Sequence, residues 1–251
     1  MASEQAGPVQ SVSRAFDILE AMADAGGELR LSELATLLGL PVPTLHRLMR
    51  ALVVGGYVRQ LPSRKYALGP RLVRLGEVAT KLTGDWAKPV LMGLAEALGE
   101  TVNMATLDGN MMIYVAQAPS PHSMRMFTEV GRRVYTHCTG VGKAVLAHMP
   151  EARVRAIIGR SGMPAQTENT ITDIETLLAE LQAIRERGYA VDDGEQEFGV
   201  RCFTVAVPGA EVPTAVSVSG PTVRVTWELC ERAVPLLRAA AEQLAPEPTR
   251  G

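Results

Sequence analysis

The feature that most constrains this chain is a pair of short amphipathic segments separated by a glycine-containing turn. A hydroxyl side chain is typical of a helix N-cap, so Ser32 predicts a first helix at 32–38. The turn follows at Gly39. Proline is favoured in the first turn of a helix, and Pro41 or Pro43 therefore begins a second helix that continues to about residue 54. Helix, short turn and helix together predict a helix-turn-helix unit.

The second of these helices separates apolar from polar side chains. Its apolar residues, spaced to form one buried helix face, are Leu45, Leu48, Met49 and Leu52. A helix of about 12 residues is roughly 18 Å long, which suits the major groove of DNA with the N-terminal side chains at base edges. The candidate DNA contacts on this helix are Pro43, Thr44, His46, Arg47 and Arg50. Of these, Thr44 and Arg47 are best placed to read bases.

A basic hairpin is predicted directly after the second helix. The segment YVRQLPSRKYAL alternates in polarity, which indicates two short strands at 57–61 and 65–68, joined around Pro62 and Ser63. Arg64 and Lys65 lie at the tip of this hairpin and are candidates for contacts with phosphate. Such a hairpin is the wing of a winged helix.

Charge is distributed unevenly along the chain. Between Leu34 and Gly76 there are seven Lys and Arg and no Asp or Glu, whereas the remainder has 18 basic and 27 acidic residues, or −9. A phosphate backbone attracts such a basic block. The helical pair, the basic hairpin and the absence of acids together predict winged-helix DNA binding. Two alternatives are a solvated basic face and a protein-interaction scaffold that uses the helical hairpin.

Hydrophobic periodicity divides the chain into three parts. We expect a winged helix-turn-helix DNA-binding domain at 9–70, a linker helix at 71–85 and a second domain at 86–246. The apolar stripe of the linker helix is Leu72, Leu75, Val78, Ala79 and Leu82.

The second domain mixes predicted helices and strands. Helices are expected at 86–98, 141–148, 173–187 and 223–244, and strands at 124–129, 202–207 and 214–218 and in a hairpin within 101–118. Thr172 and Glu175 form a capping box for the helix at 173–187. This mixture predicts an α+β fold.

Cysteine usage and hydropathy bear on the compartment. Cys138, Cys202 and Cys230 are odd in number and far apart, which argues against a disulfide framework and for a reducing compartment. No apolar run approaches the roughly 18 to 20 residues that cross a bilayer, and the N-terminus lacks the pattern of a signal peptide. A cytoplasmic protein without membrane partners is expected.

The segment TGVGK at 139–143 resembles a phosphate-binding loop only superficially. That loop requires Gly where His137 stands and Ser or Thr where Ala144 stands. Small residues that lead into a helix still leave unpaired backbone N–H groups at its N-terminus, and these can bind a carboxylate. The alternative is a tight strand-to-helix turn without a ligand.

The chain resembles the isocitrate-lyase-regulator (IclR) family of bacterial transcription factors over nearly its whole length. The resemblance is carried by VQSVSRAFDILEAMADAGGELRLSELATLLGLPVPTLHRLMRALVVGGYV and YALGPRLVRLG, then by THCTGVGKAVLAHMP, YAVDDGEQEFGVRCFTVAVPG and AVSVSGP. It implies a winged helix that binds palindromic operators as a dimer or tetramer. It also implies a GAF-like effector-binding domain that holds a small, often carboxylate-bearing effector.

The resemblance also implies which residues bind the effector. Gly140 and Val141 match positions that line the pocket, and Asp192 and Cys202 match pocket positions of glyoxylate- and pyruvate-responsive members. Ser217 and Ser219 either face the pocket or simply alternate along a strand. An equally simple account has Asp192 capping a turn and Cys202 buried as a small hydrophobe.

Two departures from the family pattern leave the effector's identity open. Gly194 stands where many members have an acid, and residues 124–127 differ from those of relatives that recognise aromatic acids. The segment MRMFTEVGRR is similar to a group associated with allantoin and glyoxylate metabolism. A small organic acid is the expected effector, and the expected regulator is a repressor.

An enzyme is the remaining alternative. GxSxG, HExxH and CxxC are all absent, and His137 and Cys138 lack further ligands at metal spacing. His122 and His148 are expected to be ordinary hydrogen-bonded groups. The sequence therefore predicts neither catalysis, nor a metal, nor a cofactor.

Overall fold

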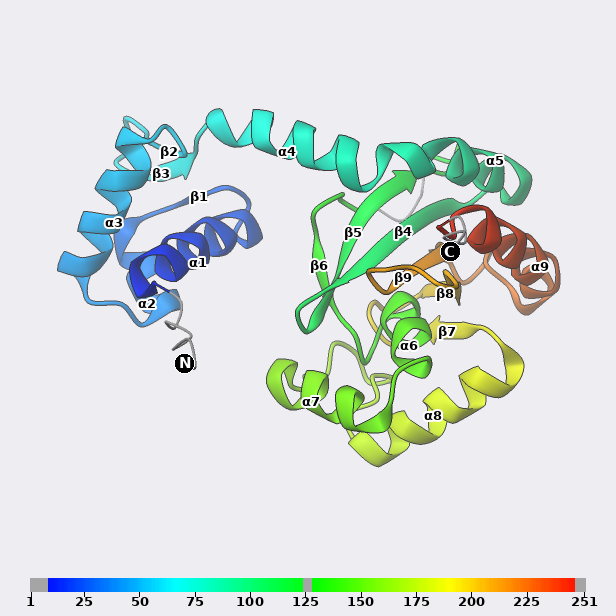
Figure 1. Ribbon diagram of the computed structural model, residues 1–251. Helices are drawn as coiled ribbons and strands as arrows, with labels where there is room; N and C mark the ends of the chain where they lie inside the picture. The colour runs from blue at the N-terminus through cyan, green and yellow to red at the C-terminus, as the bar shows by residue number, and fades with distance from the viewer. Residues whose placement is uncertain (1–8, 124–127, 247–251) are drawn as a thin grey trace, which may run out of the picture. The chain divides into compact units, whose positions relative to one another are not determined.

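The chain forms two compact units, Met1–Ala79 and Thr80–Gly251, which we call the winged unit and the sheet unit. Figure 1 shows the computed structural model, which describes residues 9–123 and 128–246. The division falls inside a helix.

The winged unit consists of three helices and a small antiparallel sheet. Its elements are α1 (Gln10–Asp24), β1 (Glu28–Leu29), α2 (Leu31–Leu38), α3 (Val42–Val54), β2 (Val58–Gln60) and β3 (Tyr66–Leu68). The strand order is β1-β3-β2, and Ala67 of β3 lies opposite Glu28 on one side and Arg59 on the other. The helix-turn-helix and the wing are therefore present as predicted. The two-residue strand β1 was not predicted, because two residues carry no periodicity.

The core of the winged unit contains the apolar face predicted for α3. Its buried members are Ile18, Met22, Leu34, Leu45, Leu48, Met49, Leu52 and Val58. The helical spacing of Val12, Ala15, Phe16, Leu19 and Met22 predicts that they form the buried face of α1. This prediction is wrong in part, because Val12 and Phe16 are exposed and the buried face is centred nearer Ile18 and Met22.

Two predicted helix caps are wrong by one or two residues. The N-cap of α2 is Arg30 rather than Ser32, and its backbone N–H donates to Glu33 Oε2 at 2.6 Å. In the sheet unit Asp173 caps α8 and accepts from the Thr176 N–H at 2.8 Å, so Thr172 is not the cap. At α8 the adjacent Thr172 and Asp173 are both capping residues, and the helix begins after the second. At α2 the Glu33 carboxylate accepts from the Arg30 N–H, so the helix begins before Ser32.

The sheet unit is built on six antiparallel strands. Its strands are β4 (Thr101–Asp108), β5 (Met111–Ala118), β6 (Arg133–Tyr135), β7 (Ala190–Asp193), β8 (Val200–Ala206) and β9 (Thr214–Pro221). They are arranged in the order β6-β5-β4-β9-β8-β7. The predicted hairpin is β4 and β5, and the predicted strands at 202–207 and 214–218 correspond to β8 and β9.

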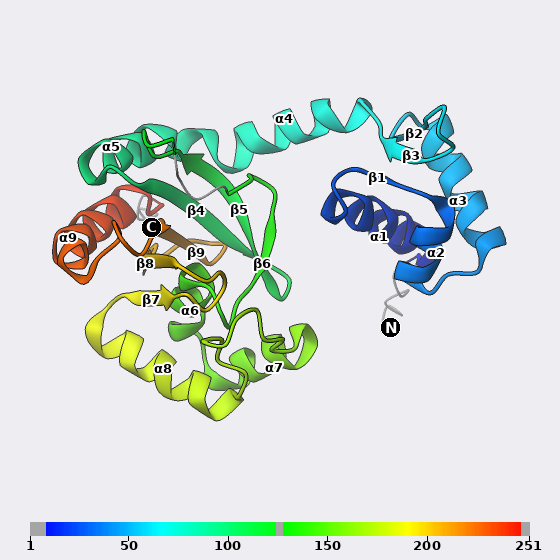
Figure 2. The same cartoon turned by 180° about the vertical axis from the view of Figure 1, so that it is seen from behind.

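Helices cover both faces of this sheet (Figure 1 and Figure 2). The helical elements are η1 (Asp85–Ala87), α5 (Lys88–Leu98), α6 (Gly140–Ala147), α7 (Glu151–Ser161), α8 (Ile174–Arg187) and α9 (Trp227–Gln243). Helices α5 and α9 pack on one face in one apolar cluster, while α6, α7 and α8 belong to a second cluster on the other face. The α+β architecture is confirmed.

Several predicted elements of the sheet unit need correction. Residues 124–127 of the strand predicted at 124–129 lie outside the described residues, and 128–129 are not in a strand. The last helix begins at Trp227 rather than at residue 223, with Thr226 as its N-cap. Strands β6 and β7 and helix α7 were not predicted. Helix α7 buries only Val154, Ile157 and Ile158, too short a stripe to stand out from its polar surroundings.

Helix α4 (Arg71–Thr83) corresponds to the predicted linker helix and has no buried residue. Leu75, Val78 and Leu82 of its predicted apolar stripe are exposed. Within residues 9–123 and 128–246, no single helix has both the length and the apolarity to cross a membrane. Helices α2 and α3, which meet at 115°, satisfy that test only if they are counted together.

Two glycines near the junction of wing and linker helix should respond oppositely to alanine. A Cβ at Gly69 would lie 2.2 Å from the Gly56 carbonyl oxygen, whereas a Cβ at Gly76 meets nothing within 4 Å. Gly69→Ala should lower the free energy of unfolding of the winged unit by roughly 2 to 4 kcal/mol, because backbone must move. Gly76→Ala, inside α4, should raise helix stability by about 1 kcal/mol.

Differential scanning calorimetry of the full chain measures both effects. Trp86 and Trp227, the two tryptophans, both belong to the sheet unit, so fluorescence would report the wrong part of the molecule. Equal and small effects of the two substitutions would contradict the close approach at Gly69.

Candidate functional site

The exposed side of α3 carries the polar residues that the sequence singled out. Pro43, His46, Arg47 and Arg50 are exposed and Thr44 is half-buried, while the opposite side of the helix is in the core. Within the described residues, Arg47 and Arg50 have no hydrogen bond or ion pair with the rest of the chain. Their guanidinium groups are therefore available to phosphate or base edges.

Of the two basic residues predicted at the tip of the wing, Arg64 is exposed and Lys65 forms an ion pair. Arg64 is exposed at the tip with φ +62°, where its N–H donates to the Leu61 carbonyl at 2.9 Å. Lys65 instead forms an ion pair with Glu28 at 2.8 Å. This ion pair was not predicted, because Glu28 lies outside the acid-free stretch and reaches Lys65 only through the pairing of β1 with β3. Both side chains are partly exposed, so the pair is weak and can open toward phosphate.

The strand register brings three predicted effector residues into one row across the sheet. Asp192 of β7 lies opposite Cys202 of β8, and Cys202 lies opposite Ser219 of β9. Ser217 lies opposite Thr204 in the neighbouring row. Because residues two apart in a strand share a face, all five side chains lie on the same face of the sheet.

Helix α6 lies over this face with very little clearance. A Cβ at Gly140 would lie 2.4 Å from Thr204 Oγ1 and 3.4 Å from Cys202 Cβ. A Cβ at Gly142 would lie 2.3 Å from the carbonyl oxygen of Thr136. Gly140 therefore lets the amino end of α6 approach the sheet at Cys202 and Thr204, and Gly142 lets the same helix pack against the backbone of the loop before it. The predicted residues Gly140, Val141, Asp192, Cys202, Ser217 and Ser219 are thus brought together.

Several polar groups at this place have no partner. Thr139 caps α6 and accepts from the Gly142 N–H at 3.2 Å, but within the described residues the N–H groups of Gly140 and Val141 have no acceptor. Within the same described residues, the hydroxyls of Thr204 and Ser217 are also buried without a hydrogen-bond partner. An unpaired buried polar group costs about 1 to 3 kcal/mol. Two unpaired donors at the end of α6 and two unpaired hydroxyls on the sheet face beside it are groups that a small polar ligand can satisfy.

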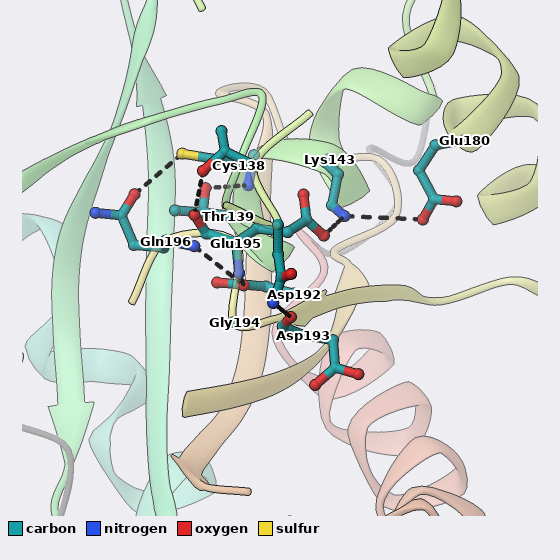
Figure 3. Close-up of polar contacts among 12 residues, drawn as sticks. Cys138, Thr139, Lys143, Glu180, Asp192, Asp193, Gly194, Glu195 and Gln196 are labelled. Carbon is teal, nitrogen blue, oxygen red and sulfur yellow. Dashed lines mark hydrogen bonds and ion pairs between the residues drawn. The ribbon is translucent and has the colours of Figure 1, made fainter. Parts of the chain in front are cut away.

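Asp192 is a buried carboxyl that holds a turn. Its Oδ1 accepts from the N–H of Glu195 at 2.8 Å and from that of Gln196 at 3.3 Å, as Figure 3 shows. Turn capping, an alternative in the sequence analysis, is therefore present. Burial, and then the negative charge of Glu195, raise the pKa of Asp192 to about 7. A carboxyl of this kind changes charge near neutral pH.

A buried ion network joins this turn to α6. Lys143 is 1% exposed and pairs with Glu195, and its Nζ lies 3.8 Å from Glu180 (Figure 3). Glu180 in turn forms an ion pair with Arg187 at 2.6 Å. The lysine that made TGVGK resemble a phosphate loop is therefore used inside the protein, to hold the turn after β7 against α6.

The two cysteines near the site are neutral, buried groups. Cys138 donates its thiol to Gln196 Oε1 at 3.1 Å, and burial followed by the charge of Asp192 raises its pKa to about 12. The same causes, in the same order, raise the pKa of Cys202. Neither thiol is an activated nucleophile. In the part of the chain that the structure describes, no three His, Cys, Asp or Glu side chains converge as metal ligands would.

Sequence reasoning missed Thr204, Glu195 and the internal role of Lys143. Thr204 could have been found from the alternation of side chains along a strand, since it lies two residues after Cys202 and so shares its face. A lysine within the apolar run GVGKAVLA was a signal of a buried charge. No local pattern indicated its partner Glu195, which is 52 residues away.

Comparison with known proteins relates both units to one group of regulators. Residues 11–62 match the sequence profile of the IclR helix-turn-helix domain, and residues 84–245 match that of the bacterial transcriptional regulator IclR C-terminal domain. The transcriptional repressor IclR of Escherichia coli (strain K12) is 35% identical over 244 residues, which cover 94% of this chain and 89% of that protein. The two profiles match in the order in which the winged and sheet units occur.

Solved structures agree with these matches. An IclR transcriptional regulator from Alicyclobacillus acidocaldarius has a TM-score of 0.82 and 31% identity, with 94% of this chain and 98% of that chain covered. An IclR homolog complexed with 4-hydroxybenzoate, from Microbacterium hydrocarbonoxydans, has a TM-score of 0.73 and 25% identity, with 92% and 95% covered. The 4-hydroxybenzoate in that complex is a small carboxylic acid.

Two buried threonines on the same sheet face provide a matched test of the unpaired hydroxyls. Thr204→Val removes a hydroxyl that has no partner and should raise the free energy of unfolding by about 1 kcal/mol. Thr101→Val removes the acceptor of the Ser120 N–H, 3.2 Å away, and should lower it by about 1 kcal/mol. Denaturant unfolding followed by tryptophan fluorescence measures both, and effects of the same sign would contradict the assignment.

Asp192→Asn should change how stability depends on pH. A raised pKa favours the neutral carboxyl, so the stability it contributes is fully present below the unfolded-state pKa and is lost as the pH rises through about 7. Asparagine cannot ionise and does not lose this stability. The free energy of unfolding of the variant, relative to that of wild type, should therefore rise by about 2 to 3 kcal/mol from pH 5 to pH 8. Asp193→Asn, at a partly exposed carboxylate paired with Arg201, is the control and should show no such gain. Denaturant titrations at both pH values measure the difference.

Proposed function

The chain belongs to the IclR family of bacterial transcriptional regulators, and we propose that it is a repressor whose binding to a palindromic operator is controlled by a small organic acid. Membership in this family makes it a DNA-binding regulator rather than an enzyme or a protein-interaction scaffold. The repressor named above is its relative over most of both chains, which supports repression as the direction of control.

One observation carries the proposal of a carboxylate effector. The N–H groups of Gly140 and Val141, unpaired within the described residues, lie at the positive end of α6. Gly140 is beside Thr204, and the hydroxyls of Thr204 and of Ser217, its partner in the strand pair, are unpaired within the same residues. The amino end of a helix favours an anion, and two adjacent N–H groups suit the two oxygens of a carboxylate. The hydroxyls can bind a second polar group of the same ligand.

The DNA contacts follow from the exposed cations of the winged unit. We expect α3 to enter the major groove with Thr44, His46 and Arg47 toward the bases, and Pro43 and Arg50 beside them. Arg64 and, once released from Glu28, Lys65 then contact phosphate through the wing. A single recognition helix reads few base pairs, so we propose that two or four copies assemble and read two half-sites.

Control requires that the effector distinguish two states of the protein. A ligand that binds both states equally shifts nothing, so the acid must bind better to the arrangement that releases DNA. We propose that the signal passes along residues 71–85, because α4 begins in the winged unit and ends in the sheet unit. Acting on chromosomal operators, the protein would be found in the cytoplasm.

The pathway is the least constrained part of the proposal. The segment MRMFTEVGRR, similar to a group associated with allantoin and glyoxylate metabolism, includes residues 124–127, which lie outside the described residues. The bound 4-hydroxybenzoate of a relative supports the carboxylate class and not a particular acid. Glyoxylate is therefore the first acid to test for binding, and larger monocarboxylates are tested after it.

Two substitutions should separate the two activities. Operators are first selected from random duplexes, and binding is then measured by fluorescence anisotropy over a range of salt. Arg47→Ala should weaken binding to the selected operator about 10- to 100-fold while effector binding is kept. Asp192→Ala should abolish the response to the acid while operator binding is kept. Arg160→Ala, at an exposed position on α7, should change neither.

Several outcomes would contradict the proposal. No selected sequence preferred over random duplex would exclude specific DNA binding, and binding independent of salt would exclude phosphate contacts. An operator without two-fold symmetry would exclude the dimeric reading. A saturating acid that left operator affinity unchanged would exclude effector control.

A further inference from the structure

We propose that the site at the amino end of α6 binds a monocarboxylate together with one proton, which is held between Asp192 and the bound acid. The inference rests on the proposed function and assigns Asp192 as the residue that determines which charge state the site accepts. The evidence is the placement of the charged groups around Asp192.

Asp192 is close to the groups that would receive the ligand. It lies opposite Cys202 in the strand pair, and Cys202 would be 3.4 Å from a Cβ on Gly140. The carboxyl is therefore on the same sheet face as the helix end with its free N–H groups. Asp192 is 4% exposed, so a carboxylate bound here would meet it in a site largely shielded from water.

The cations near Asp192 are already matched by other carboxylates. Lys143 pairs with Glu195 and lies near Glu180, and Arg187 pairs with Glu180. Two cations and two carboxylates thus balance one another. Within residues 9–123 and 128–246, no Lys, Arg or His forms an ion pair with Asp192, whose ionised form is then one uncompensated buried negative charge.

Among the titratable groups around Asp192 in the described residues, Lys143 is positively charged, but it lowers the pKa of Asp192 less than burial and Glu195 raise it. These groups come from every element packed against Asp192, namely the turn after β7, α6 and the loop before it, β8 and β5, and are Glu195, Lys143, Cys138, Cys202 and Tyr114. Burial raises the pKa of Cys138 to about 12 and also raises the pKa values of Cys202 and Tyr114, so these three are neutral near pH 7.

A second carboxylate makes ionisation of Asp192 untenable. Two carboxylates that share a buried site cannot both remain charged, and one proton taken from solvent converts the pair into an acid-to-carboxylate hydrogen bond. Even without a ligand, burial and Glu195 raise the pKa of Asp192 to about 7, so the proton is bound at little cost. A dicarboxylate would bring a further charge that no group in the site balances, and should bind more weakly.

Isothermal titration calorimetry of the full chain tests the proposal. The probes are the sodium salts of glyoxylate, pyruvate, lactate and 4-hydroxybenzoate, and the tightest binder is titrated in buffers of different ionisation enthalpy. The slope of the observed binding enthalpy against the ionisation enthalpy of the buffer gives the number of protons taken up per bound ligand. With a pKa of about 7 in the free protein, we expect about 0.9 proton per ligand at pH 8 and about 0.1 at pH 6. Affinity should fall about tenfold per pH unit above 7.5 and level off below pH 6.5.

Matched variants assign the proton to Asp192. In Asp192→Asn the uptake should vanish at pH 8, and any affinity that remains should not change between pH 6 and pH 8. In Asp193→Asn, which changes the adjacent carboxylate paired with Arg201, the uptake should persist. If Asp192→Asn binds no acid, the proton can be located by carbon NMR of the wild-type protein with labelled aspartate carboxyls. The proposal requires that one aspartate carboxyl stay protonated at pH 8 when the ligand is bound.

The outcomes separate this inference from the proposed function. Binding without proton uptake at pH 8, or uptake that persists in Asp192→Asn, overturns the inference and leaves the regulator intact. Binding of succinate as tight as that of the best monocarboxylate also overturns it. Failure of all four probes to bind overturns the proposed effector class, and with it this inference.

Discussion

The sheet unit depends on how closely the amino end of α6 approaches the strands beneath it. Gly140 and Gly142 leave no room for a side chain, since Thr204 Oγ1 and the Thr136 carbonyl occupy the places where a Cβ would stand. The contact at Gly140 places the first turn of α6 against Cys202 and Thr204 of β8. A side chain at Gly140 would push the helix away from the sheet, whereas one at Gly142 would push it away from the backbone of Thr136.

The polar side chains around that contact hold the site in shape and leave part of it unsatisfied. Lys143 and Glu195 fix the turn after β7, and that turn aims its N–H groups at Asp192. The hydroxyls of Thr204 and Ser217 remain unpaired, as do the first two N–H groups of α6 within the described residues. A chain selected for stability alone would bury valine at such positions. Unsatisfied groups that cluster in one place indicate a ligand that completes them.

The sequence predicted best those elements whose signals are local. The winged unit has a clear helical period, a glycine turn and a polar hairpin, and α3 buries the four residues expected of it. The signal failed where competing residues stood side by side, as at the cap of α8, and where an element was too short for a period, as in β1 and β6. The ion pair of Lys65 with Glu28 arises from strand pairing across 37 residues, which no local pattern records.

The candidate site, too, could be predicted from the sequence only in part, because the rest depends on which distant residues the strand register brings together. Family resemblance supplied Gly140, Val141, Asp192 and Cys202, and the sequence left open whether Ser217 and Ser219 face the site. The strand register places both serines on the same sheet face as Cys202, and their hydrogen bonds distinguish them. Ser219 accepts from Asn103 Nδ2 at 3.0 Å, whereas the Ser217 hydroxyl has no partner. In the proposed effector site, Ser219 is therefore part of the wall, and Ser217 and Thr204 have the hydroxyls that a ligand would bind.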